Sequence, residues 1–98
     1  MGAAMARYRI VRWKDIPSLV EAVDGDHTAR RPLSQRFQDL IDTIAMREGA
    51  SGTEAYLEAW EQGQELERPG GAETVAEEVA AELEAAFADL VARFLPPA

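Results

Sequence analysis

The first third of the chain has the residue pattern of β-strands separated by turns. Residues 7–14 are rich in aromatic and β-branched side chains, which favour extended structure. Pro17 interrupts this pattern, and residues 19–23 and 27–31 predict two more strands. The Asp-Gly pair between these two is a strong hairpin signal, which predicts a positive φ at Gly25. We therefore expect a three-stranded antiparallel meander.

Apolar residues follow the helical period after this meander. From Phe37 to Ala45 they recur at intervals that place them on one face of a helix. Ser34 is expected to cap the start of the helix, and Gly49 is expected to end it in a left-handed conformation. The pattern therefore predicts one amphipathic helix between these two residues.

A second, shorter helix is predicted before residue 63. Ser51 and Glu54 have the spacing of a capping box, and Gly63 is expected to end the helix. Residues 61–72 are polar and contain Pro-Gly-Gly, which breaks regular structure. We interpret this segment as a mobile linker.

The chain ends in a long predicted helix. Thr74 and Glu77 again have capping-box spacing, and nothing interrupts the helix before Pro96. A straight helix over residues 74–95 would be about 33 Å long. A row of alanines on its polar side offers a surface for a weak homodimer, whereas in a monomer these alanines simply favour the helix. The row consists of Ala81, Ala85, Ala88 and Ala92.

These elements predict a single α+β domain over residues 1–98, with residues 1–6 disordered. Its architecture is a three-stranded antiparallel β-meander followed by two short helices and one long C-terminal helix. The core is expected to combine apolar residues of the strands with one face of each helix. The predicted core residues are Ile10, Val11, Trp13, Leu19, Val23, Phe37, Leu40, Ile41, Ile44, Leu57, Trp60, Val79, Leu83, Phe87, Leu90, Val91 and Phe94.

Charge divides the chain into two unequal halves. Residues 1–47 contain eight Lys and Arg against six Asp and Glu, a net charge of +2. The other 51 residues contain two Arg against twelve acidic residues, a net charge of −10, so the chain carries −8. This acidity disfavours nonspecific binding to nucleic acid. A basic sheet beside acidic helices indicates an interaction surface more than a catalytic pocket.

The composition offers little for catalysis or metal binding. The chain has no cysteine and one histidine, His27, which we interpret as a solvated turn residue. No side chains stand at catalytic motif spacing, and no phosphate-binding glycine loop is present. We therefore expect a protein that is not catalytic alone and has no metal or cofactor. The lack of cysteine and of a long apolar run favours a cytoplasmic protein without a membrane segment.

Basic residues of the predicted strands and first helix are the candidates for a binding site. They are Arg9, Arg12, Lys14, Arg30, Arg31 and Arg36. Our first interpretation is that these side chains pair with acidic helices of the same molecule and keep the sheet edge soluble. The second is a site for a protein partner or an acidic ligand. RNA binding ranks third, because the aromatic residues are few.

Three segments also carry a family pattern. Residues 8–17 combine an aromatic and basic strand with Asp-Ile-Pro, residues 31–38 read RPLSQRFQ, and residues 55–60 read AYLEAW. Together they resemble the bacterial virulence factor domain family, whose domain also forms the C-terminal part of conserved virulence factor C. The resemblance covers residues 7–66 and leaves the long acidic helix outside. It assigns no catalytic residue and implies an accessory role beside folate- and corrinoid-dependent one-carbon enzymes.

The sequence thus predicts a noncatalytic interaction or accessory module. It would bind a protein partner or an acidic ligand through a basic sheet face. The alternative is a small accessory subunit of a folate- or corrinoid-linked one-carbon methyltransferase system. Such a subunit would co-purify with a catalytic partner in fixed stoichiometry.

Overall fold

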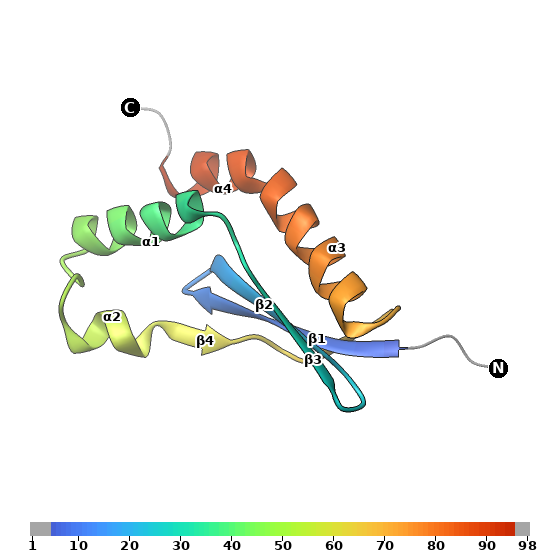
Figure 1. Cartoon of the computed structure of the whole chain (residues 1–98). Coiled ribbons are helices and arrows are strands. Elements are labelled where there is room, and N and C mark those ends of the chain that lie inside the picture. Colours follow the sequence, from blue (N-terminus) through green and yellow to red (C-terminus); the bar gives the residue numbers. More distant parts are fainter. Residues whose placement is uncertain (1–4, 96–98) are drawn as a thin grey trace.

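The computed structural model describes residues 5–95 and shows an α+β fold with one five-stranded antiparallel sheet. The first three strands form the predicted meander, β1 (Met5–Trp13), β2 (Ile16–Asp24) and β3 (His27–Pro32) (Figure 1). Met5 and Ala6, expected within a disordered stretch, belong to β1. Residues 1–4 lie outside the described residues.

Both turns of the meander are tight. Gly25 lies between β2 and β3 at φ 61°, which confirms its predicted positive φ. Lys14, between β1 and β2, has φ 54°, a conformation that is uncommon for a residue with a side chain. Its backbone N–H donates to the carbonyl oxygen of Ala59 at 3.0 Å. This bond ties the β1–β2 turn to a segment that comes much later in the chain.

The predicted linker over residues 61–72 is wrong, because half of it belongs to two short strands. These are β4 (Trp60–Gln62) and β5 (Leu66–Pro69), and both pair with the edge of β1 that β2 leaves free. The sheet order is therefore β3-β2-β1, with β4 and β5 sharing the next position. Between them, Gly63 donates its N–H to the carbonyl oxygen of Ile10 at 2.9 Å.

Arg68 fixes β5 to the helix above it. Its guanidinium donates to both carboxylate oxygens of Glu82, at 2.7 and 3.0 Å, and lies 5.5 Å from the ring centre of Tyr8. The hydrogen bond from Arg68 lowers the pKa of Glu82. The bidentate Arg68–Glu82 pair thus holds β5, a polar strand, against α3.

The helices also differ from the prediction. They are α1 (Gln35–Arg47), α2 (Glu54–Glu58), α3 (Ala72–Ala85) and α4 (Phe87–Phe94). The single long C-terminal helix is wrong, since it is broken at Ala86. The break divides the predicted alanine row between two helices, with two of its residues on α3 and two on α4.

The C-terminus of α1 has the structure that the sequence predicts. Gly49 ends α1 at φ 69°, as predicted. The N–H groups of Gly49 and Ala50 bond to the carbonyl oxygens of Met46 and Ala45 at 3.2 and 2.8 Å, which is the Schellman pattern.

The two predicted capping boxes are wrong. Thr53 occupies the N-cap of α2 and Gly71 that of α3, and neither makes a side-chain capping bond. Ser34 does occupy the N-cap of α1, but its side chain does not bond to that helix either. A capping-box spacing alone therefore misplaced two helix starts by a few residues.

α3 lies against one side of the sheet (Figure 1), and one apolar cluster joins the two. Alternation along β1 and β2 directs every second side chain toward α3, where valines and alanines meet them. The small alanines let the helix approach the strands closely. The buried members are Ala6, Ile10, Val20, Ala22, Ala29, Ala72, Val75, Ala76 and Val79.

A second cluster surrounds the tip of the β1–β2 hairpin. Trp13 is fully buried there, and its indole N–H donates to the carbonyl oxygen of Tyr56 at 2.8 Å. α1, α2 and α4 contribute the surrounding residues. The buried members are Trp13, Ile16, Leu40, Ile41, Ile44 and Ala45, and Tyr56, Ala59, Trp60, Phe87, Leu90, Val91, Phe94 and Leu95 pack against them.

Two residues of the predicted core are exposed. Val23 is 40% exposed and Leu57 is 68% exposed, so both predictions are wrong. Trp60 is only half-buried and begins β4 rather than belonging to a helix. The prediction also missed several fully buried residues, which are Ala6, Ile16, Val20, Ala22 and Ala76.

None of the helices within residues 5–95 is long and apolar enough to cross a membrane.

Replacing Gly25 with Val should lower the free energy of unfolding by about 1 kcal/mol or more, because a β-branched residue resists a positive φ. No atom lies within 4 Å of the added Cβ, so the effect isolates backbone strain. Urea unfolding would measure it. The neighbouring Asp26→Ala, which has no positive φ, is the control. Equal stabilities for the two variants would contradict the assigned turn.

Truncating Trp13 to Ala should cost about 3–5 kcal/mol, because it removes a fully buried indole and its hydrogen bond. Leu57→Ala removes an exposed side chain and should change stability by less than about 0.5 kcal/mol. Thermal unfolding of both variants tests the placement of the second cluster. A small loss for Trp13→Ala would show that the hairpin tip is not packed as described.

Candidate binding surfaces

The predicted basic cluster does not form one site. The structure distributes its six residues over the uncovered face of the sheet, a cleft at the end of β1, the edge of β3 and the start of α1. Arg31 illustrates the dispersal, since it is exposed on the edge strand and pairs in register with Val20, whose side chain lies on the α3 side. The six residues therefore belong to four separate parts of the surface.

Arg9 and Arg30 lie on the face of the sheet opposite α3. They stand on either side of Glu21 in register across β1, β2 and β3. Arg30 Nε lies 3.3 Å from a Glu21 carboxylate oxygen. Arg9 donates to the side-chain oxygen of Gln62 at 2.8 Å and to Glu65 at 3.3 Å. The residues that β4, β5 and their connection bring alongside β1 thus engage Arg9.

This surface, which we call the uncovered face, carries balanced charges. Three arginines, Arg7, Arg9 and Arg30, stand against three glutamates, Glu21, Glu65 and Glu67. It is therefore less basic than the sequence predicts, because β5 and the connection before it, which the sequence did not predict to join the sheet, supply Glu67 and Glu65. Its apolar residues are Val11, Leu19 and Val23, which are all at least partly exposed.

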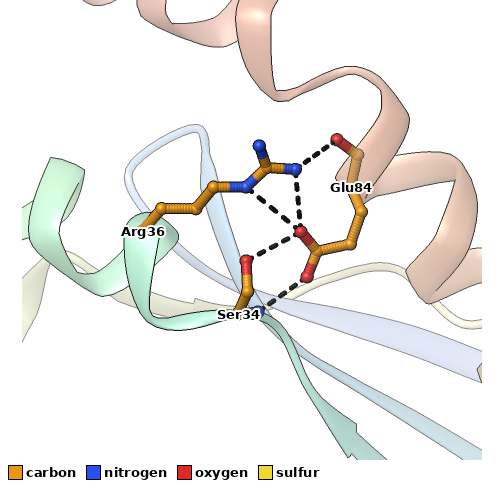
Figure 2. A network of polar contacts seen from close by, with 3 residues as sticks. All are labelled: Ser34, Arg36 and Glu84. Atoms are coloured by element: carbon orange, nitrogen blue, oxygen red, sulfur yellow. Dashed lines mark hydrogen bonds and ion pairs between the residues drawn. The ribbon is translucent and has the colours of Figure 1, made fainter.

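Arg36 is engaged inside the molecule (Figure 2). Its guanidinium bonds to a carboxylate oxygen of Glu84 at 3.0 Å and to the backbone carbonyl of the same residue at 2.8 Å. The hydroxyl and backbone N–H of Ser34 both donate to the Glu84 carboxylate at 2.7 Å. Arg36 also lies 4.4 Å from the ring centre of Phe87. These contacts give Arg36 a structural role at the junction of α1, α3 and α4.

The network explains where α3 ends. The backbone carbonyl of Glu84 accepts from Arg36, and in a continuous helix it would accept from the N–H four residues later. A basic side chain can satisfy a last-turn carbonyl that has lost its helical partner, and Arg36 does so here. The break thus needs neither proline nor glycine.

The same contacts act on the ionisation of Glu84. Partial burial disfavours the charged carboxylate, but hydrogen bonds from Ser34 and Arg36 outweigh it and lower the pKa of Glu84. The ionised form is therefore the one that the folded state stabilises.

A cleft of about 490 Å³ lies between the end of β1 and the α3–α4 bend. Arg12, Lys14 and Arg93 supply its positive charges, and Asp15 and Glu61 its negative charges. Lys14 forms an ion pair with Glu48 outside the cleft, and Arg93 Nη2 lies 3.8 Å from Asp15. Of the three cations, Arg12 makes no ion pair or side-chain hydrogen bond with any residue between 5 and 95.

The described residues form no metal-ligand cluster, and the single histidine lies apart from the basic residues. Within residues 5–95, no three His, Asp or Glu side chains gather as metal ligands. His27 is exposed at the start of β3. The sequence reasoning missed Glu61, Gly63 and Arg93 as cleft residues, because the first two lay in the supposed linker and the third in an unbroken helix.

Residues 11–92 match a protein family described as Virulence factor. The chain belongs to this family. The match confirms the resemblance seen in the sequence and extends it, because it includes α3 and most of α4. The matched region thus comprises the sheet from the end of β1 onward and most of the bent helical segment. No curated protein and no solved structure matches the chain.

Glu84→Gln should destabilise this virulence factor domain by about 1 kcal/mol near neutral pH, since it weakens charge-assisted bonds at a partly exposed site. The pKa of Glu84 is lower in the folded state than in the unfolded state. Its carboxylate therefore contributes fully to the free energy of unfolding above the unfolded pKa, about 4.3, and this contribution is lost as pH falls through the folded pKa. The difference between wild type and variant should therefore shrink at about pH 3.5.

Urea unfolding at both pH values measures this difference. Glu77→Gln, an exposed carboxylate on the same helix, is the matched control. A difference that stays constant with pH would contradict the role given to the Glu84 carboxylate.

Proposed function

We propose that the domain is a noncatalytic interaction module that binds a protein partner through the uncovered face. The observation that carries the proposal is the one-sided covering of the sheet. α3 packs on one face, while Val23 remains 40% exposed on the other, among arginine side chains. The side chains of Arg7 and Arg30 are 64% and 63% exposed. Exposed valine and arginine side chains on a rigid sheet are suited to an interface.

The charge arrangement indicates which partner fits. Arg7 and Arg9 share the single carboxylate of Glu65, at 3.5 and 3.3 Å, and so keep free N–H donors. A partner carboxylate can take these donors without breaking the existing pairs. Val11, Leu19 and Val23 would meet apolar side chains of the partner. The expected partner surface is therefore apolar at its centre and acidic at its margin.

The alternative, an accessory subunit of a one-carbon methyltransferase system, rests on the family resemblance. Both proposals use the same docking surface and differ in the partner. Identification of a folate- or corrinoid-dependent enzyme as that partner would favour the alternative.

The test is chemical crosslinking in extracts of the native host, followed by mass spectrometry. Crosslinks should map to β1, β2 and β3. The recovered partner, once purified, should bind Arg7→Gln/Arg30→Gln about tenfold more weakly than wild type, with a smaller dependence on salt. Arg31→Gln/Arg47→Gln makes the same change of charge away from the uncovered face and should bind as wild type does.

Three results would overturn the proposal. Crosslinks could map to the helical side of the domain, the control variant could lose binding as much as the face variant, or the wild type could capture no specific partner. Circular dichroism of each variant separates a lost contact from a lost fold.

A further inference from the structure

The cleft beside Arg12 is separate from the uncovered face. Register places Arg12 on the side of β1 that faces the helices, and the cleft wall includes Leu83 and Leu90 on either side of the α3–α4 bend. The bend curves over this end of the sheet (Figure 1). A volume of about 490 Å³ lies within the range of small-molecule sites.

The backbone is shaped to hold Arg12 in this cleft. Gly63 lies beside it, and a Cβ at this position would come within 3.3 Å of Arg12 Nη1 and within 2.6 Å of the Ile10 carbonyl oxygen. The close approach to the Ile10 carbonyl therefore requires glycine here, and the missing side chain also leaves room for the Arg12 guanidinium. Arg12 is partly buried and lines the cleft, and its guanidinium donors are unused by residues 5–95. A planar guanidinium with free donors is suited to a carboxylate.

A carboxylate of the same cleft is also unpaired. Glu61 is the register partner of Arg12 on β4, yet no ion pair within 4 Å joins the two side chains. The position of Arg12 Nη1 accounts for this, because it lies over Gly63, two residues along the strand. The cleft thus presents one positive and one negative group side by side, each without a partner among residues 5–95. A simple anion would use Arg12 but would be repelled by Glu61.

We propose that the cleft binds a small zwitterion with an apolar side chain, of the chemical class of α-amino acids. Its carboxylate would accept from Arg12, and its ammonium would donate to Glu61. Leu83, Leu90 and the buried Pro17 would contact its apolar side chain. This ligand satisfies both unpaired charges and the apolar wall together, which neither an anion nor a cation does alone.

Three related probes separate the contributions. L-Leucine carries both charges, 4-methylpentanoate is the same skeleton without the ammonium, and 3-methylbutylamine is the skeleton without the carboxylate. Each is titrated into the ¹⁵N-labelled chain, up to the millimolar range, and followed by amide chemical shifts. Leucine should shift the amides of Gly63, Leu83 and Leu90, and should bind about tenfold more tightly than either truncated probe.

The variants test which residue meets which charge. Arg12→Gln should reduce leucine binding about tenfold and remove its advantage over 3-methylbutylamine. Glu61→Gln should reduce it by a similar factor and remove its advantage over 4-methylpentanoate. Arg7→Gln, on the opposite face of the sheet, should leave all three affinities unchanged. If Arg12→Gln does not fold, Arg12→Lys keeps the charge but loses the planar donor pair, and should also weaken binding.

The outcomes are decisive in both directions. Equal affinity for leucine and 4-methylpentanoate would overturn the zwitterion proposal, as would leucine affinities that the Arg12 and Glu61 variants leave unchanged. The absence of any leucine-induced shift at these amides would also overturn it. These results do not depend on the partner surface, since Arg7→Gln changes only the uncovered face.

Discussion

The bend between α3 and α4 is the constraint on which the rest of the domain depends. The C-terminal helical segment has to cover two apolar surfaces that do not lie on one line. Val75, Ala76 and Val79 of α3 pack on the sheet, whereas Leu90 and Phe94 of α4 pack with α1 around the hairpin tip. A straight helix could cover one of these surfaces but not both. The break at Ala86 lets one segment close both clusters.

Polar contacts hold the bend in place. Ser34 and Arg36, at the start of α1, both bond to Glu84, at the end of α3. Phe37 and Phe87 meet edge to face beside them, with ring centres 4.8 Å apart. Individual exposed ion pairs contribute little to stability. Here several bonds converge on one carboxylate next to an aromatic pair, and together they define the angle between the helices.

The bend also connects the fold to the proposed functions. By turning over the end of β1, it closes one side of the cleft that contains Arg12 and Glu61. The uncovered face lies on the other side of the sheet. If both proposals hold, the virulence factor domain can carry a small ligand and a protein partner at the same time. The rigid sheet between the two sites would then be the element that could couple them.

The sequence by itself determined the elements that depend on short segments. Alternation, the Asp-Gly turn and the left-handed glycine after α1 specified the meander and one helix end, because these signals act within a few residues. The same local information also identified the residues of α1 that are buried, such as Phe37 and Ile41.

Only the tertiary structure decided the remaining features. β4 and β5 are short and polar, and they become strands because β1 offers a free edge and Glu82 offers a partner for Arg68. The helix break depends on Arg36, 48 residues before Glu84. The tertiary contacts also separated the six predicted basic residues. Pairing with Glu21, Glu48, Glu65 and Glu84 engages four of them and leaves Arg12 and Arg31 without an ion pair among residues 5–95. Such contacts form between residues far apart in the chain, so no local pattern records them.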